Sequence, residues 1–426
     1  MLVNSTLPKV AVRLGLVALT CVLLVNCSSL LQDHRPLGSG SQSRVQKAVD
    51  SVRTALQKSL GDSVPSLNLY IQTPTEKIFA SSGPKGYFPI TEDANFRFAS
   101  NTKTFTSTAI LKMYQDGWLD FKAKITDNIP GTAIPYVPNT PAWDFPYKNE
   151  ITIEQLLQHA AGVYDVDNDS VPGFNGLSYT AFVQNADPNH QFSTEEMVLQ
   201  LSKYKLSYFA PTTGYHYSNT GYSILGYIIA HVYSVKSGSA KTYQDYLLDH
   251  VVGPGTKVPL AIRFPVLATD TKMPVPFLGG NERLPGKPPI IFGDYNMSAQ
   301  VAEGNGYSTP VSLNAFIRSL MKGQNVLTPE TVKLMQTDVN PKTGSQYALG
   351  CFFTPNLGYG HNGERCGTLS LAMYDPATDV SVVAYINLVD NTNLTNSPDN
   401  TFIKCFFAIY EAAYGGRAAL GYPGKP

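Results

Sequence analysis

At 426 residues, with 43% hydrophobic and only 15% charged residues, the chain could form one large domain or two to three ordinary ones. Its 32 basic residues balance its 32 acidic ones, and no basic block is longer than a dipeptide, so the electrostatic footprint of a nucleic-acid-binding protein is missing. The 25 tyrosines, 34 glycines and 30 prolines predict many loops and a neutral, hydrogen-bonding surface.

The N-terminal segment, residues 1–26, is typical of a signal peptide. Lys9 and Arg13 precede an uncharged apolar stretch that is too short to span a membrane comfortably. The stretch ends in LVNC, which resembles a bacterial lipoprotein signal with Cys27 as the lipidated residue. Asn26 differs from the small residue usual at its position, so a simple cleaved signal is the alternative. We expect an exported protein of the cell envelope or periplasm, with membrane contact through an N-terminal lipid.

Both ends of the remaining chain predict strands and a covering helix. Apolar residues recur at helical spacing over residues 43–60, and SLNLYIQT then alternates at period two, like the first strand of a hairpin. Near the other end YALGCFF, TLSLAMY and DVSVVAYINL alternate too, and TFIKCFFAIYEAAYG closes as a helix. We therefore expect an antiparallel sheet built from residues 40–99 and 340–420.

The middle of the chain, residues 100–339, predicts helices instead. Five segments carry apolar residues at helical spacing: FTSTAILKMYQDG, TIEQLLQHAAG, TEEMVLQLSKY, GYSILGYIIAHVYS and TPVSLNAFIRSLMKG. Irregular connections rich in Pro and Gly lie between them, notably at residues 129–150 and 252–300. We expect a single domain over residues 40–420, of the α/β (α+β) class, with a mainly helical part inserted between the two halves of the sheet.

Three cysteines lie beyond Cys27. An exported location permits a disulfide, and Cys351 with Cys366 is the favoured pair by proximity in sequence. Buried free thiols, including Cys405, are an equal alternative, because connectivity cannot be read from sequence. Without a Cys-x-x-Cys motif or clustered histidines, we expect no metal site.

The stretch FRFASNTKTF, residues 96–105, places Ser100 and Lys103 one helical turn apart at the expected start of a helix. Serine becomes a nucleophile when a neighbour takes its proton, and a lysine can do so if burial lowers its pKa. Three other pairs have the same spacing: Ser82 and Lys85, Ser202 and Lys205, and Ser319 and Lys322. The pattern alone therefore does not identify a site.

Two further motifs follow in order, YSN at 217–219 and HNG at 361–363. The ordered set, with the contexts ITIEQLLQHAAGV, YHYSNTGYSILGY and GHNGERCG, resembles the penicillin-recognising serine hydrolases, which include serine β-lactamases, D-alanyl-D-alanine carboxypeptidases and related esterases. The resemblance implies a β-lactamase/transpeptidase-like fold and three catalytic residues, Ser100, Lys103 and Tyr217. Tyr217 and Lys103 would act as a coupled pair, and which of them is the principal base stays open.

The resemblance also implies five substrate-binding positions: Asn219, His361, Asn362, Gly363 and Glu364. The N–H of Glu364 would join that of Ser100 as the oxyanion hole. His361 in place of lysine is closer to the carboxypeptidase and esterase branches, and Asn362 replaces a hydroxyl that commonly helps to bind a substrate carboxylate. His159, in LLQHAAG, matches a recurrent family helix end and is expected to be structural.

We therefore expect a monomeric exported serine hydrolase that acts through an acyl-enzyme on amide or ester bonds, without a cofactor. A D-alanyl-D-alanine carboxypeptidase or D-amino-acid peptide hydrolase is the first expectation. A β-lactamase and a short-chain esterase are alternatives, because a fold does not choose among substrates. The alternative outside enzymes is an envelope protein that binds cell-wall peptides without turnover.

Overall fold

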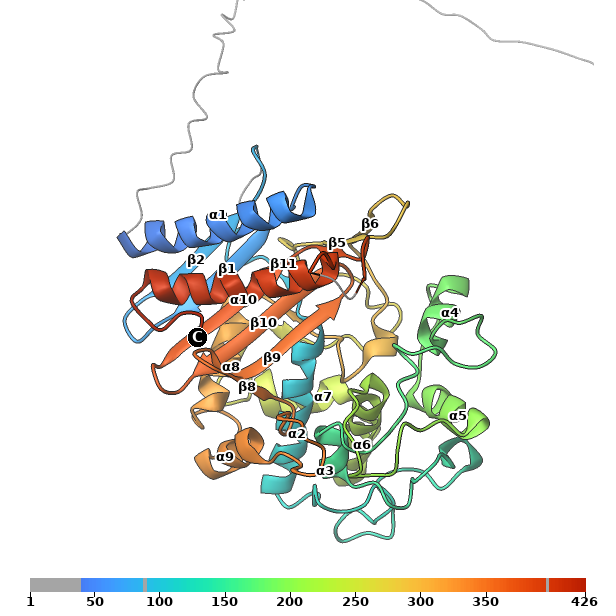
Figure 1. Cartoon of the computed structure of the whole chain (residues 1–426). Coiled ribbons are helices and arrows are strands. Elements are labelled where there is room, and N and C mark those ends of the chain that lie inside the picture. Colours follow the sequence, from blue (N-terminus) through green and yellow to red (C-terminus); the bar gives the residue numbers. More distant parts are fainter. Residues whose placement is uncertain (1–39, 87–89, 396–397) are drawn as a thin grey trace, which may run out of the picture. The chain divides into compact units, whose positions relative to one another are not determined.

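The largest sheet of the chain joins strands from its two ends. Its six strands lie in the order β2-β1-β11-β10-β9-β8, and every neighbouring pair is antiparallel (Figure 1). The register places Leu69 of β1 opposite Ala384 of β11. The strands are β1 (Leu67–Gln72), β2 (Lys77–Ser82), β8 (Phe352–Thr354), β9 (Gly358–Arg365), β10 (Thr368–Asp375) and β11 (Val380–Ile386). The predicted sheet from both chain ends is confirmed.

The computed structural model describes residues 40–86, 90–395 and 398–426. The predicted signal peptide, residues 1–26, and the predicted lipidation site Cys27 lie outside the described residues. Within them, no helix combines the length and apolar character needed to cross a membrane.

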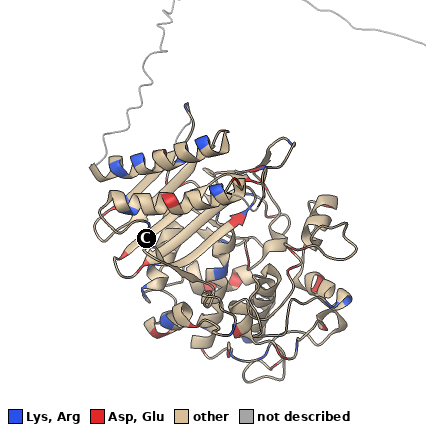
Figure 2. Ribbon diagram, in the orientation of Figure 1, with Lys and Arg blue, Asp and Glu red and all other residues tan. Residues whose placement is uncertain are grey.

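Helices α1 (Gly40–Leu60) and α10 (Thr401–Ala419) lie side by side over one face of the large sheet (Figure 1). Alternate strand residues such as Leu69 and Ile71 pack against them in one apolar core, whereas Tyr70 faces the second core on the opposite side. Because both faces are covered, every residue of β10 and β11 is buried. Lys and Arg residues recur along α1, while most of the ribbon belongs to uncharged residues (Figure 2).

The helical part packs on the second face of the sheet, where α8 contacts β10 and β11. Several of its helices begin at a side-chain cap, as Thr309 does for α8 and Ser218 for α6. Its helices are α2 (Thr102–Gln115), α3 (Ile153–Leu157), α4 (Tyr179–Ala186), α5 (Thr194–Tyr204), α6 (Asn219–Ser237), α7 (Tyr243–Leu247), α8 (Pro310–Met321) and α9 (Pro329–Thr337). The five predicted helices are present, and α4, α7 and α9 are additional.

Two small sheets take strands from residues 252–300, where the sequence predicted an irregular connection, and from other parts of the chain. One has the order β3-β7-β4, with β3 at Phe96–Arg97, β7 at Tyr307–Ser308 and β4 at Ile262–Arg263. The other has the order β12-β5-β6, with β12 at Val389–Asp390, β5 at Gly280–Arg283 and β6 at Ile290–Phe292. The first sheet places the segment before Ser100 against the segment after Glu303, which brings two distant parts of the chain to the same site.

One local expectation needs correction. YALGCFF forms a strand only from Phe352, because Gly350 adopts a positive φ of 73° and packs tightly on Ser107, so the backbone turns there. Of the two alternatives left open for the cysteines, the structure has the free thiols: Cys351, Cys366 and Cys405 are free and buried.

Candidate active site

The Ser-x-x-Lys motif lies at a helix start, as its spacing predicted. Ser100 is in a 3-10 turn, Ala99–Asn101, that leads directly into α2, and Lys103 is the second residue of α2. The Lys103 Nζ donates a hydrogen bond of 3.2 Å to the Ser100 Oγ. Ser100 is half-buried, whereas Lys103 is fully buried. Ser100 is therefore the more accessible of the two residues.

The backbone before Ser100 is in an unusual conformation. Ala99 has a φ of 50°, in the left-handed region that non-glycine residues seldom adopt. A buried hydrogen bond of 2.7 Å from the Thr102 Oγ1 to the Ala99 carbonyl holds this turn. Strain of this kind, about 1–3 kcal/mol, persists where the surrounding structure fixes it and clusters at active sites.

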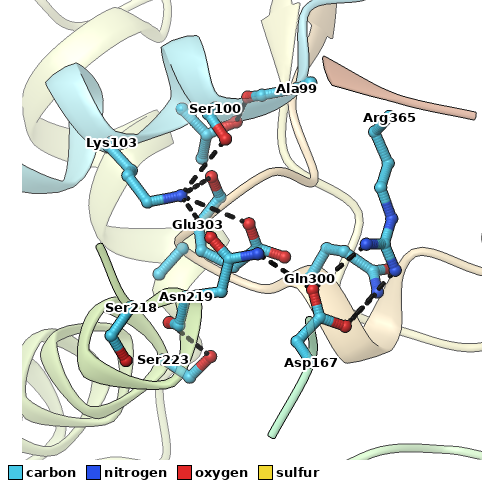
Figure 3. A network of polar contacts seen from close by, with 12 residues as sticks. Ala99, Ser100, Lys103, Asp167, Ser218, Asn219, Ser223, Gln300, Glu303 and Arg365 are labelled. Atoms are coloured by element: carbon cyan, nitrogen blue, oxygen red, sulfur yellow. Dashed lines mark hydrogen bonds and ion pairs between the residues drawn. The ribbon is translucent and has the colours of Figure 1, made fainter. Parts of the chain in front are cut away.

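Lys103 is the centre of a buried polar network (Figure 3). Its Nζ donates to the Asn219 Oδ1 at 2.7 Å and to the Glu303 carbonyl at 2.9 Å, and it forms an ion pair with the Glu303 Oε2 at 3.3 Å. Burial lowers the pKa of Lys103, and the Glu303 carboxylate opposes that shift. Burial also raises the pKa of Glu303 to about 8, against the pull of Lys103. The two groups therefore approach each other in proton affinity.

Tyr217 lies on the other side of Lys103. The Lys103 Nζ is 4.7 Å from the centroid of the Tyr217 ring. Burial holds the pKa of Tyr217 well above its ordinary value, although the neighbouring Ser100 side chain lowers it. The phenol is therefore a proton donor in the resting protein. The three predicted catalytic side chains are thus in mutual contact.

His159 holds the segment that carries Tyr217. Its Nδ1 accepts a hydrogen bond of 3.1 Å from the Ser218 N–H, and its ring centroid lies 4.2 Å from that of Tyr217. Burial keeps the pKa of His159 well below its ordinary value, so the imidazole is neutral and can accept. The structural role predicted for His159 is confirmed.

Asn219 connects Lys103 to a pair of aspartates. Its side-chain Nδ2 donates to the Asp167 Oδ2 at 2.9 Å, and its backbone N–H donates to the Asp165 Oδ2 at 2.9 Å. Its amide oxygen is occupied by Lys103. Asn219 therefore links Lys103 to Asp167, and the substrate contact expected of Asn219 stays a prediction.

Asp167 is paired with Arg365 at the end of β9. The Arg365 Nη1 lies 3.1 Å from the Asp167 Oδ2, and Thr180 and Gln300 donate to the Oδ1. Burial disfavours the Asp167 charge, but Arg365 and these hydrogen bonds together hold the pKa of Asp167 below its ordinary value. A cavity of 640 Å³ opens beside this ion pair and is also lined by Thr180, Asn296 and Phe292.

Strand β9 closes the site over Ser100. A Cβ added to Gly363 would lie 2.4 Å from the Phe98 carbonyl oxygen and 2.8 Å from the Ser100 backbone N, so only glycine fits this close approach. Glu364 follows, paired with Leu369 of β10, and its side chain is exposed. The oxyanion hole formed by the two N–H groups stays a prediction.

The remaining β9 positions differ from expectation. His361 is buried: its Nδ1–H donates to the Asn362 carbonyl, and its Nε2 accepts from the Tyr347 hydroxyl at 2.8 Å. Burial, and then the charge on Lys103, lowers the pKa of His361 to about 3, so the ring is neutral. The Asn362 side chain lies on the opposite face of β9, where it donates to Tyr410 of α10 at 2.8 Å. It is therefore turned away from Ser100, because successive strand residues face opposite sides.

In the other three Ser-Lys pairs, the serine makes a hydrogen bond to a group other than its lysine. Ser82 accepts a hydrogen bond from Arg53, Ser202 donates to the Ala142 carbonyl, and Ser319 donates to the Ala315 carbonyl. Among residues 40–86, 90–395 and 398–426, no group of three His, Cys, Asp or Glu side chains is arranged to hold a metal ion.

The sequence did not predict several residues of the network, among them Asp167, Glu303 and Arg365. Arg365 directly follows the predicted HNG and Glu364 positions, so the strand periodicity could have placed it on the face of Gly363. Asp167 lies in the acidic stretch YDVDND and Glu303 in AEGNG. Neither stretch has a pattern that indicates chemistry.

Comparisons with known proteins agree with this geometry. The sequence model of the Beta-lactamase family matches residues 53–401. A penicillin-binding protein of Bacillus subtilis (strain 168) is 29% identical over 160 residues, which are 37% of this chain and 28% of that relative's length. The D-amino acid amidase of Ochrobactrum anthropi SV3, solved with D-phenylalanine, has a TM-score of 0.66 at 22% identity over 90% of this chain and 99% of its own. A D-stereospecific amidohydrolase of Streptomyces sp. has a TM-score of 0.64 at 21% identity over 86% and 98%. At these identities, the likeness shows that the two proteins have the same fold as this chain.

Proposed function

The chain belongs to the Beta-lactamase family, and from that membership we propose that it is a serine hydrolase that cleaves amide bonds next to a D-amino acid. Ser100 is the nucleophile, Lys103 and Tyr217 move its proton, and the N–H groups of Ser100 and Glu364 hold the oxyanion. Attack by Ser100 forms an acyl-enzyme and releases the amine, and water then releases the acid.

The observation that carries this proposal is the contact between Ser100 and Lys103. An amine that is fully buried and lies 3.2 Å from the Oγ of a half-buried serine is placed to exchange a proton with that serine rather than with solvent. Purely peptide-binding proteins do not need a buried lysine next to an accessible serine. The non-catalytic alternative is therefore disfavoured.

The surroundings of His361 favour an amide without a free terminal carboxylate over the carboxypeptidase substrate. A carboxylate is recognised by a cation or by hydroxyl donors. His361 is neutral, with both ring nitrogens bonded within the protein, and the Asn362 amide faces α10. The fold shared with two proteins named as D-amino acid amidase and D-stereospecific amidohydrolase supports the same substrate class.

The test compares hydrolysis of D-phenylalanine amide, L-phenylalanine amide, a D-Ala-D-Ala peptide and nitrocefin by the purified chain. We expect turnover of the D-amide in preference to the other three, and its loss in Ser100→Ala. A labelled fluorophosphonate should add to Ser100. Preferred release of D-alanine from the peptide would restore the carboxypeptidase assignment, and preferred opening of nitrocefin would indicate a β-lactamase. Adduct on another residue would overturn the mechanism.

A further inference from the structure

Glu303 is a buried carboxyl that the proposed mechanism does not use. Its Oε2 lies 3.3 Å from the Lys103 Nζ, and the two side chains are 3% and 0% exposed. The Ser100 Oγ lies 3.2 Å from the same nitrogen. A hydroxyl, an amine and a carboxyl are thus in series, with the lysine in the middle.

The environment of Glu303 does not suit a permanent anion. An ionised carboxylate can accept about four hydrogen bonds. The Glu303 Oε2 has Lys103, but the buried Oε1 has no hydrogen-bond partner among the described residues. A buried charge that is only partly compensated favours the neutral form of the group.

The charge balance of the network points the same way. Three carboxyls face two cations, Lys103 on α2 and Arg365 on β9. The groups that act on Lys103 or Glu303 are Asp165 and Asp167 from the loop before α4, Arg365, Tyr217 and Tyr222 from the α6 segment, His159, and His361 on β9. Both histidines are neutral and both tyrosines are protonated. Asp167 is paired with Arg365, so two carboxyls, Glu303 and Asp165, share the single positive charge of Lys103. One of these two carboxyls can therefore hold a proton.

We propose that Glu303 is the positioning residue that takes the proton of Lys103 and so gives Ser100 a neutral amine as its base. The inference rests on the proposed function. In the first step a proton moves from the Lys103 Nζ to the Glu303 Oε2, and the ion pair becomes a neutral pair. In the second, the Ser100 Oγ bonds to the substrate carbonyl carbon while its proton moves to Nζ.

The step balances in charge and protons. The oxyanion, the Lys103 ammonium and the neutral Glu303 carry the same total charge as the starting ion pair and neutral substrate. When the carbon–nitrogen bond breaks, Tyr217 gives its proton to the leaving nitrogen and regains one from Lys103. The Glu303 proton then returns to Lys103, which restores the ion pair. No oxidant, reductant or second reactant is needed.

The experiment measures the rate at which a fluorophosphonate labels Ser100, as a function of pH and at two temperatures. This probe isolates proton removal from serine, because fluoride leaves without a proton. The variants are Glu303→Gln, which removes the proton acceptor at nearly constant shape, and Glu303→Asp, which keeps a carboxyl. Glu154→Gln is the matched control, because Glu154 is a half-buried carboxyl with its pKa raised by burial to about 7 whose cationic partner is Lys122.

We expect the wild-type rate to rise with pH and level off near the pKa of Glu303, about 8. Because a carboxyl ionises with little heat and an ammonium with much, this inflection should hardly move between the two temperatures. In Glu303→Gln the inflection should become strongly temperature-dependent, because Lys103 must then lose its proton to solvent. Glu303→Asp should restore the temperature-insensitive inflection, and Glu154→Gln should behave as wild type.

Other outcomes overturn the inference. If the wild-type inflection is itself strongly temperature-dependent, Lys103 or Tyr217 titrates directly and Glu303 takes no proton. If Glu303→Gln keeps the wild-type profile, the carboxyl is not involved. A drop in rate that is equal at every pH would assign Glu303 only a structural role. Should Glu303→Gln fail to fold, the wild-type and Glu303→Asp profiles still decide. Absence of labelling at Ser100 in the wild type would instead refute the proposed function.

Discussion

Gly363→Ala tests the closeness of β9 to the nucleophile. The new Cβ would lie 2.4 Å from the Phe98 carbonyl oxygen and 2.8 Å from the Ser100 backbone N. Ordinary contact begins at 3.4 Å, so the strand and the turn must separate by about 1 Å. Both sides of the contact are backbone, and no side chain can rotate away.

The expected effect is larger on activity than on stability. A displacement of about 1 Å at the reacting atoms costs about 10²-fold in rate. Overpacking in a dense region costs about 1–3 kcal/mol, which for a chain of this size lowers the Tm by a few degrees. We therefore expect the Gly363→Ala rate of Ser100 labelling by fluorophosphonate to fall about 10²-fold, while the variant stays folded.

Gly304→Ala is the matched control. Its Cβ would meet the Gln300 Cβ at 3.8 Å and the Ala99 carbonyl carbon at 3.9 Å, which are ordinary contacts close to the same turn. Labelling of this variant should stay near the wild-type rate. The reasoning fails if Gly363→Ala labels as fast as wild type, or if both substitutions slow labelling equally.

Two further predictions concern neighbouring groups. Tyr217→Phe keeps the ring over Lys103 and against His159 but removes the proton donor. The kcat on the amide substrate should therefore fall about 10²- to 10⁴-fold, with little change in the unfolding midpoint. An unchanged kcat would exclude the phenol from proton transfer. His361 has a pKa of about 3 in the folded chain against an ordinary value of 6.5, so the unfolded chain binds the extra proton between these values. Its contribution to stability is therefore complete above pH 6.5 and is lost as the pH falls towards 3. Urea unfolding at a series of pH values should show a shallower loss in His361→Gln, and parallel curves would contradict the buried neutral ring.

The regular parts of the fold could be predicted because their burial leaves a period in the sequence. β1 alternates Leu67, Leu69 and Ile71 towards one core, and α8 carries a Thr309 cap with Pro310 in its first turn. α9 has the same signals in Thr328 and Pro329 and could have been found. The short strands β4 to β6 could not, because two to four residues are too few to establish a period.

The proximity of Ser100 and Lys103 could be predicted from the sequence, and the residues that surround this pair could not. Ser100 and Lys103 are three residues apart, so helix geometry alone brings them together. Glu303 reaches Lys103 across 200 positions, and Arg365 reaches Asp167 across 198. Such pairs follow from the packing of whole elements, as the pairing of β3 with β7 does for Glu303, and no local pattern records them.

The buried support explains how one site can combine a reactive amine with a stable fold. Removing one partner of a buried ion pair costs about 3–5 kcal/mol, because the other charge is left without compensation. Asn219 joins the two pairs of this site, accepting from Lys103 and donating to Asp167. The charge of Glu303 is the less well compensated of the two carboxylates, because its Oε1 has no hydrogen-bond partner among the described residues. Asp167, in contrast, accepts hydrogen bonds from Thr180 and Gln300 in addition to its ion pair with Arg365. This difference is why we place the proposed proton movement at the Lys103–Glu303 pair, next to Ser100, and a purely positioning role at the Asp167–Arg365 pair.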